Sequence, residues 1–137
     1  VDADTIAERL AKVDPDLLER LTTTIVRFGK GEEMGRVSPI LYRKAGRSKI
    51  NWHWFRVLPD QGEAVARLRE DFREFLEKMI EDGATAAFRL QPGDALFFRD
   101  DEVLHGRKAY AAQHSGDRLL WKTHFISSAS LAHAHVA

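Results

Sequence analysis

One long amphipathic segment, flanked on both sides by strand-like stretches, constrains the fold of this chain most. From Gly62 to Ile80 the apolar residues recur at helical spacing, and Gly83 comes next as a stop signal. The residues of this apolar face are Val65, Leu68, Phe72, Phe75, Leu76, Met79 and Ile80. The sequence therefore predicts one long helix that packs one face against the rest of the domain.

The segments around this helix are short and rich in strand formers. Two short helices are expected first, at residues 4–12 and 15–22, with Asp4 as an N-cap and Pro15 in a first turn. Apolar, β-branched or aromatic runs then predict strands at 22–28, 37–42, 49–58, 86–90, 95–98 and 118–126. The predicted fold class is mainly β with helices, a β-sandwich with one long buttressing helix.

Composition limits the classes of function. The 137 residues suffice for a single domain with a real core, and 44% hydrophobic with 31% charged residues is typical of a globular protein. Lys+Arg and Asp+Glu both number 21, which argues against nucleic acid as a partner, and the absence of cysteine excludes disulfides and thiolate metal sites. No signal peptide or membrane-spanning run is visible, so we expect a cytoplasmic protein that does not bind membranes.

Two basic side chains near the end of the chain carry the chemistry. Pro92 and Gly93 predict a tight turn that aims the next apolar strand, and His105 stands just past that strand. Arg118 opens another predicted strand thirteen positions later, with Lys122 on the same face. An imidazole can hold a metal, and an inward-facing arginine needs an anion because an unpaired buried charge is costly.

The order and spacing of these residues resemble the C-terminal half of the iron(II)/2-oxoglutarate-dependent oxygenases of the taurine dioxygenase and clavaminate synthase type. The resemblance implies a double-stranded β-helix, or jelly roll, of which residues 1–137 supply the C-terminal portion as a single domain. It also implies that His105 is the distal iron ligand and that Arg118 binds the far carboxylate of 2-oxoglutarate. Arg107, in the family's His-Gly-Arg triplet, is then an organising residue whose partners are acids of the 99–102 loop.

The activity implied is that of a non-haem dioxygenase of hydroxylase type, with Fe(II) as cofactor and 2-oxoglutarate and O2 as co-substrates. Lys122 corresponds to a basic position that grips anionic substrates in several members, so a small anionic or amino-acid-like substrate is expected. Trp52 has two interpretations: core packing, which we favour, or one wall of the substrate site. Desaturation, epoxidation and halogenation remain open as alternative outcomes.

The family's other two iron ligands, an upstream His-x-Asp or His-x-Glu pair, are not present, since Trp54 and Phe55 come directly after His53. We favour the interpretation that this chain is the C-terminal part of a longer enzyme, whose N-terminal segment carries these two ligands. The alternatives are one half of a split enzyme completed by a partner chain, and a non-catalytic jelly-roll binding module; a homo-oligomer is compatible with each. His133 and His135 form a less favoured metal pair, because they stand in a tail of small residues.

Overall fold

The structure is a computed structural model that describes residues 1–30, 33–106, 114 and 122–123. By internal contacts the chain divides into two units, Val1–Gly106 and Arg107–Ala137. Nearly all described residues belong to the first unit, and the helices, sheets and core all lie within it.

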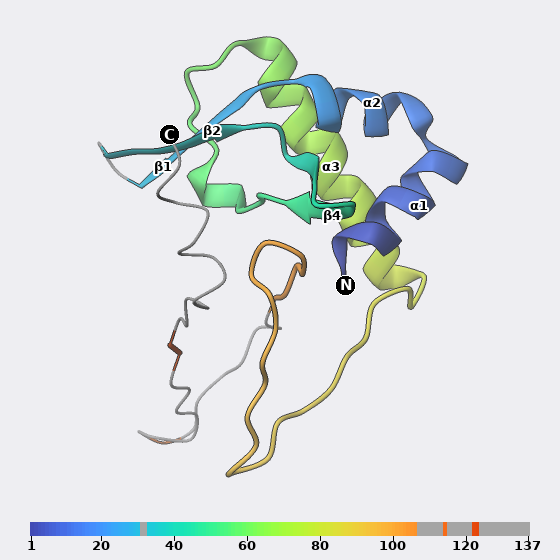
Figure 1. Ribbon diagram of the computed structural model, residues 1–137, viewed down its shortest axis with the longest axis vertical. Helices are drawn as coiled ribbons and strands as arrows, with labels where there is room; N and C mark the ends of the chain where they lie inside the picture. The colour runs from blue at the N-terminus through green and yellow to red at the C-terminus, as the bar shows by residue number, and fades with distance from the viewer. Residues whose placement is uncertain (31–32, 107–113, 115–121, 124–137) are drawn as a thin grey trace. The chain divides into compact units, whose positions relative to one another are not determined.

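Two short helices open this unit, as the sequence predicts (Figure 1). Helix α1 spans Ala3–Val13 and helix α2 spans Pro15–Thr23, with the proline in the first turn where its missing N–H costs nothing. The N-cap of α1 is Asp2, whose carboxylate accepts the amide of Thr5 at 2.8 Å, so the prediction of Asp4 as the cap is wrong. Asp4 lies in the first helical turn instead.

Helix α3, Glu63–Glu81, is the long helix, and its prediction is confirmed. Its buried residues Val65, Leu68, Phe72 and Met79 come from the apolar face identified in the sequence. This face contacts α2 and contributes to a core that also includes Ile6, Leu10, Leu17, Leu21, Val26, Phe28, Ile40, Leu41, Ile50 and Val57. Burial of this apolar surface is the main force that holds the unit together.

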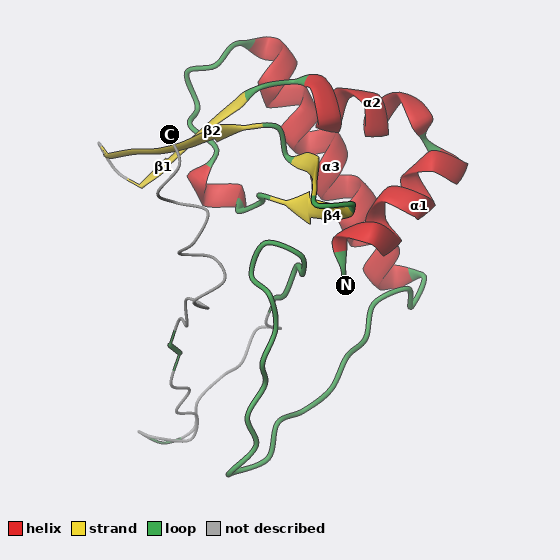
Figure 2. Cartoon of the chain, viewed as in Figure 1, coloured by secondary structure: helices red, strands yellow, loops and turns green. Residues whose placement is uncertain are grey.

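The described strands form two small antiparallel sheets, each of two strands (Figure 2). Strand β1, Val26–Lys30, pairs with β2, Glu33–Ser38, with a register shift between Phe28 and Gly29. Strand β3, Leu41–Lys44, pairs with β4, Arg47–Ile50, so that Leu41 stands opposite Ile50. Both hairpins place apolar side chains in the core shared with the helices.

Three predicted strands have different limits from those of the strands in the structure. The first residues of the 22–28 run belong to α2, where Thr22 and Thr23 donate their hydroxyls to carbonyls of the preceding turn. The 37–42 run is split into the end of β2 and the start of β3, because Pro39 has no N–H to donate to a ladder. The 49–58 run pairs with β3 only as far as Ile50 and continues into a short 3₁₀ helix at Trp54–Arg56, after which Val57 forms an isolated antiparallel bridge with Phe28.

Residues 86–90 and 95–98 are not strands in the structure, so these two predictions are wrong. Both runs are apolar enough for strands, but no described strand lies beside them to complete a hydrogen-bonded ladder. The turn between them is confirmed: Gly93 has φ +95°, and Asp94 donates its amide to the Gln91 carbonyl at 3.0 Å.

The described residues thus form a mixed arrangement of helices and short antiparallel strands. The long buttressing helix is present, whereas the jelly roll and the limits of the domain stay predictions. In the described part of the chain, no helix combines the length and apolar character that crossing a bilayer requires.

Candidate functional site

His105, the predicted iron ligand, lies at the end of the first unit with its side chain exposed. Its ring contacts that of Phe98, with centroids 4.5 Å apart, so the chain between these two residues closes into a loop. No hydrogen bond among the described residues involves an imidazole nitrogen of His105. The side chain therefore fits the role of one metal ligand.

The loop that leads to His105 is fixed to the body of the unit by its backbone. Asp101 accepts the amide of Ile50 at 2.8 Å, and Glu102 accepts the amide of Ala3 at 2.7 Å. Leu104 donates its amide to the Val1 carbonyl at 2.9 Å. Residues 101–104 are therefore held between strand β4 and the start of α1.

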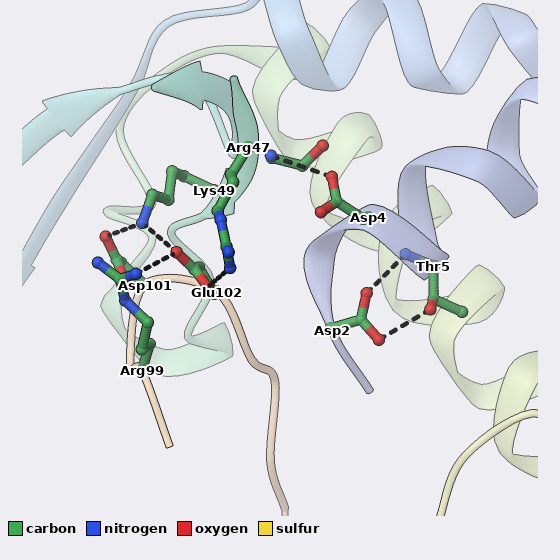
Figure 3. Close-up of polar contacts among 9 residues, drawn as sticks. Asp2, Asp4, Thr5, Arg47, Lys49, Arg99, Asp101 and Glu102 are labelled. Carbon is green, nitrogen blue, oxygen red and sulfur yellow. Dashed lines mark hydrogen bonds and ion pairs between the residues drawn. The ribbon is translucent and has the colours of Figure 1, made fainter. Parts of the chain in front are cut away.

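Side-chain charges reinforce this attachment (Figure 3). Lys49 points from β4 toward the loop, and its Nζ lies 2.8 Å from a carboxylate oxygen of Asp101 and 2.6 Å from one of Glu102. Glu102 also pairs with Arg47 and with Arg99, each at 3.3 Å. The side chain of Lys49 is only 6% exposed and that of Glu102 13%, so the pair between them is largely withdrawn from water.

The protonation equilibria reflect this pairing. Burial acts to lower the pKa of Lys49, but hydrogen bonds to Asp101 and Glu102 outweigh it and raise the pKa above its ordinary value. Burial acts to raise the pKa of Asp101, yet the hydrogen bond and charge of Lys49 leave it lowered. The Lys49 hydrogen bond is the main cause of the lowered pKa of Glu102. All three groups are therefore charged at neutral pH.

Trp52, the candidate substrate wall, packs against the core. Its ring meets that of Phe72 edge to face, with centroids 4.8 Å apart, and lies 6.3 Å from that of Trp54. The Trp54 ring is in turn covered by the guanidinium of Arg69 at 4.2 Å. This packing supports the core interpretation of Trp52, and its role in substrate binding stays a prediction.

The remaining predicted site residues all belong to the second unit. Lys122 is described and exposed, but it belongs to the second unit. Arg107 and Arg118 lie outside the described residues, as do His133 and His135. The acids of the 99–102 loop, expected as partners of Arg107, have the described partners Lys49, Arg47 and Arg99.

Within the described ranges, no three His, Asp or Glu side chains are gathered closely enough to hold a metal ion. His105 therefore fits as one ligand of an iron site but does not form such a site with its described neighbours. Three ligands on one face are what iron oxygenases of the two-histidine, one-carboxylate type require.

Comparison with protein families identifies the chain. Residues 1–124 match the family described as taurine catabolism dioxygenase TauD, TfdA family. The chain belongs to this family, whose members generally use Fe(II) and 2-oxoglutarate with O2. No curated protein and no solved structure matches the chain.

Lys49, the residue that joins β4 to the loop before His105, is not among the site residues predicted from the sequence. Residues 100–102 form a turn. Glu102 is nevertheless largely buried against Lys49, 53 positions away in the chain. The pattern around Lys49 is that of an ordinary strand lysine, so no local signal separates it from an exposed one.

Proposed function

We propose that this chain forms part of a non-haem Fe(II)- and 2-oxoglutarate-dependent dioxygenase of hydroxylase type. The observation that carries the proposal is the family match over residues 1–124, which includes His105 and Arg118. The anchored loop before His105 is consistent with it, since a metal ligand needs a fixed position. Bound iron would supply the oxidising chemistry, and the protein supplies binding and orientation.

Each candidate residue has a separate role in this proposal. His105 contributes one iron ligand, and Arg118 pairs through its guanidinium with the far carboxylate of 2-oxoglutarate. Lys122 holds an acidic group of a small, anionic or amino-acid-like substrate, and Arg107 orders the segment after His105. The other iron ligands come from an N-terminal segment or from a partner chain, and the complete fold is a jelly roll.

Succinate release from 2-oxoglutarate in the presence of Fe(II) tests this activity, with a panel of amino acids and small acids as substrates. We expect His105→Ala and Arg118→Ala each to lower turnover at least about 100-fold, since outer-shell losses alone cost 10- to 100-fold. His53→Ala and Arg67→Ala are matched controls, because they remove an exposed imidazole and an arginine that is 80% exposed. Full turnover by His105→Ala would contradict the ligand assignment.

The same assay separates the alternatives. A split enzyme releases succinate only after the complementary chain is added. A non-catalytic binding module takes up no iron and releases no succinate under either condition, and that result would end the proposal of a dioxygenase.

A further inference from the structure

We propose that Lys49 is a positioning residue for His105: its buried ammonium group holds the 99–104 loop against β4 and so fixes where the imidazole is presented. The proposal rests on the proposed function for its consequence for iron. Its structural half concerns only described contacts within the first unit.

The first observation is that a charged side chain, that of Lys49, is buried. The Lys49 side chain is 6% exposed, and withdrawing an ammonium group from water is costly unless carboxylates compensate. Asp101 and Glu102 provide that compensation at 2.8 and 2.6 Å, from adjacent positions of one loop. A single lysine thus fixes two consecutive residues of the loop.

The second observation is the geometry of the carboxylate cluster. Glu102 receives Arg47 and Arg99 in addition to Lys49, so cations from β4 and from the loop itself converge on it (Figure 3). Arg99 also closes the turn through its carbonyl, which accepts the amides of Glu102 and Val103 at 3.0 and 3.1 Å. These contacts define the orientation of the loop, which an apolar contact of the same area would not do.

The third observation is the place of the attachment in the chain. Residues 84–98 contain no helix or strand. The attachment at residues 101–104 ends one peptide bond before His105, and Phe98 touches the imidazole across the turn. Among the described contacts, those of residues 101–104 are the last before His105, and Lys49 supplies their charged part together with Arg47 and Arg99.

The test compares Lys49→Met with Arg20→Met in the purified protein. Arg20 pairs with Asp71 at 2.7 Å between α2 and α3, so its loss removes an ion pair of similar length on other elements. We expect Lys49→Met to speed amide hydrogen exchange of Glu102 to Leu104 at least 10-fold. We also expect the Fe(II) concentration for half-maximal succinate release to rise about 10-fold or more, as for other residues that orient metal ligands. Arg20→Met should change neither.

Two further variants distinguish the loss of this ion pair from a general loss of folding. Glu102→Gln keeps the shape of the side chain and removes its charge, and should reproduce both effects in weaker form. Lys49→Arg keeps the charge and should restore much of the loop protection. Unchanged exchange in the loop, or faster exchange spread evenly over the unit, would overturn the proposal.

The exchange measurement also separates this proposal from the proposed function. If no preparation releases succinate, the dioxygenase assignment fails. Loss of protection confined to residues 102–104 still supports Lys49 as the anchor of the loop, and unchanged protection still refutes it.

Discussion

Removing the indole of Trp52 should destabilise the protein, because the structure places this ring against the core. Trp52 is partly buried and meets the fully buried Phe72 edge to face at 4.8 Å. Complete burial of a large aromatic is worth about 3–5 kcal/mol on truncation to alanine, so we expect about 2–3 kcal/mol for the half-buried Trp52→Ala. This is a large share of a typical stability of about 5–15 kcal/mol.

A double-mutant cycle isolates the ring contact itself. Phe72→Leu keeps most of the apolar volume and should cost about 1.5 kcal/mol, and the double variant should cost about 0.5–1.5 kcal/mol less than the two single changes together. Urea unfolding followed by far-UV circular dichroism measures each value without depending on tryptophan emission. Trp54→Ala is the comparison variant, and it should cost about 1 kcal/mol because its ring lies 6.3 Å from that of Trp52 and under the guanidinium of Arg69.

The kinetic result completes this test. If Trp52→Ala leaves the free energy of unfolding within about 0.5 kcal/mol of the unaltered protein and raises KM for substrate, the core argument is refuted, since exposed sites show changes of that size. The ring would then be a wall of the substrate site. A loss of stability with unchanged KM would establish the packing role.

Three other contacts each lead to a prediction. The pKa values of Asp101 and Glu102 are lowered in the folded protein, so below about pH 4 the unfolded chain binds more protons than the folded one. The free energy of unfolding from urea titrations should therefore fall as the pH drops there, and it should fall less steeply in Lys49→Met. Equal slopes in both proteins would count against the charge cluster. Asp2→Ala should cost about 1 kcal/mol in thermal unfolding by loss of the α1 cap, and no change in Tm would refute that cap. Lys122→Ala should raise KM for an acidic substrate at least 10-fold without changing Tm, and an unchanged KM would exclude its role.

The helices could be predicted from the sequence because their signals are local. The apolar period of α3 and the proline at the start of α2 lie within the elements they define. The N-cap of α1 was misplaced by two residues because Asp2 and Asp4 are equally good candidates by type. Only the hydrogen bond to Thr5 separates them.

The strands were harder to predict because a strand depends on a neighbour that is distant in sequence. Residues 51–58 have the aromatic content of a strand, but β3 offers a partner only as far as Leu41. Residues 86–90 and 95–98 have no described partner strand at all. Apolar character indicated where chain segments could pair, and the partner decided whether they do.

The candidate site likewise contains one residue that the local sequence marks and one that only tertiary contacts mark. His105 could be singled out because a turn and an apolar run precede it and a small neighbour comes after it, all within fifteen residues of sequence. Lys49 could not, because its burial depends on carboxylates 52 and 53 positions away. The residues that position a reactive group are set by tertiary contacts, whereas the reactive group itself often lies in a recognisable segment.

Equilibrium dialysis of Fe(II) with and without 2-oxoglutarate, in the absence of O2, tests the central claim most directly. If His105 holds iron and Arg118 holds the co-substrate bound beside it, each ligand must strengthen binding of the other by the same factor. We predict tighter Fe(II) binding with 2-oxoglutarate, no enhancement in Arg118→Ala, and weak binding under both conditions in His105→Ala. Fe(II) binding by His105→Ala equal to that of the unaltered protein, with the same enhancement, would contradict the account.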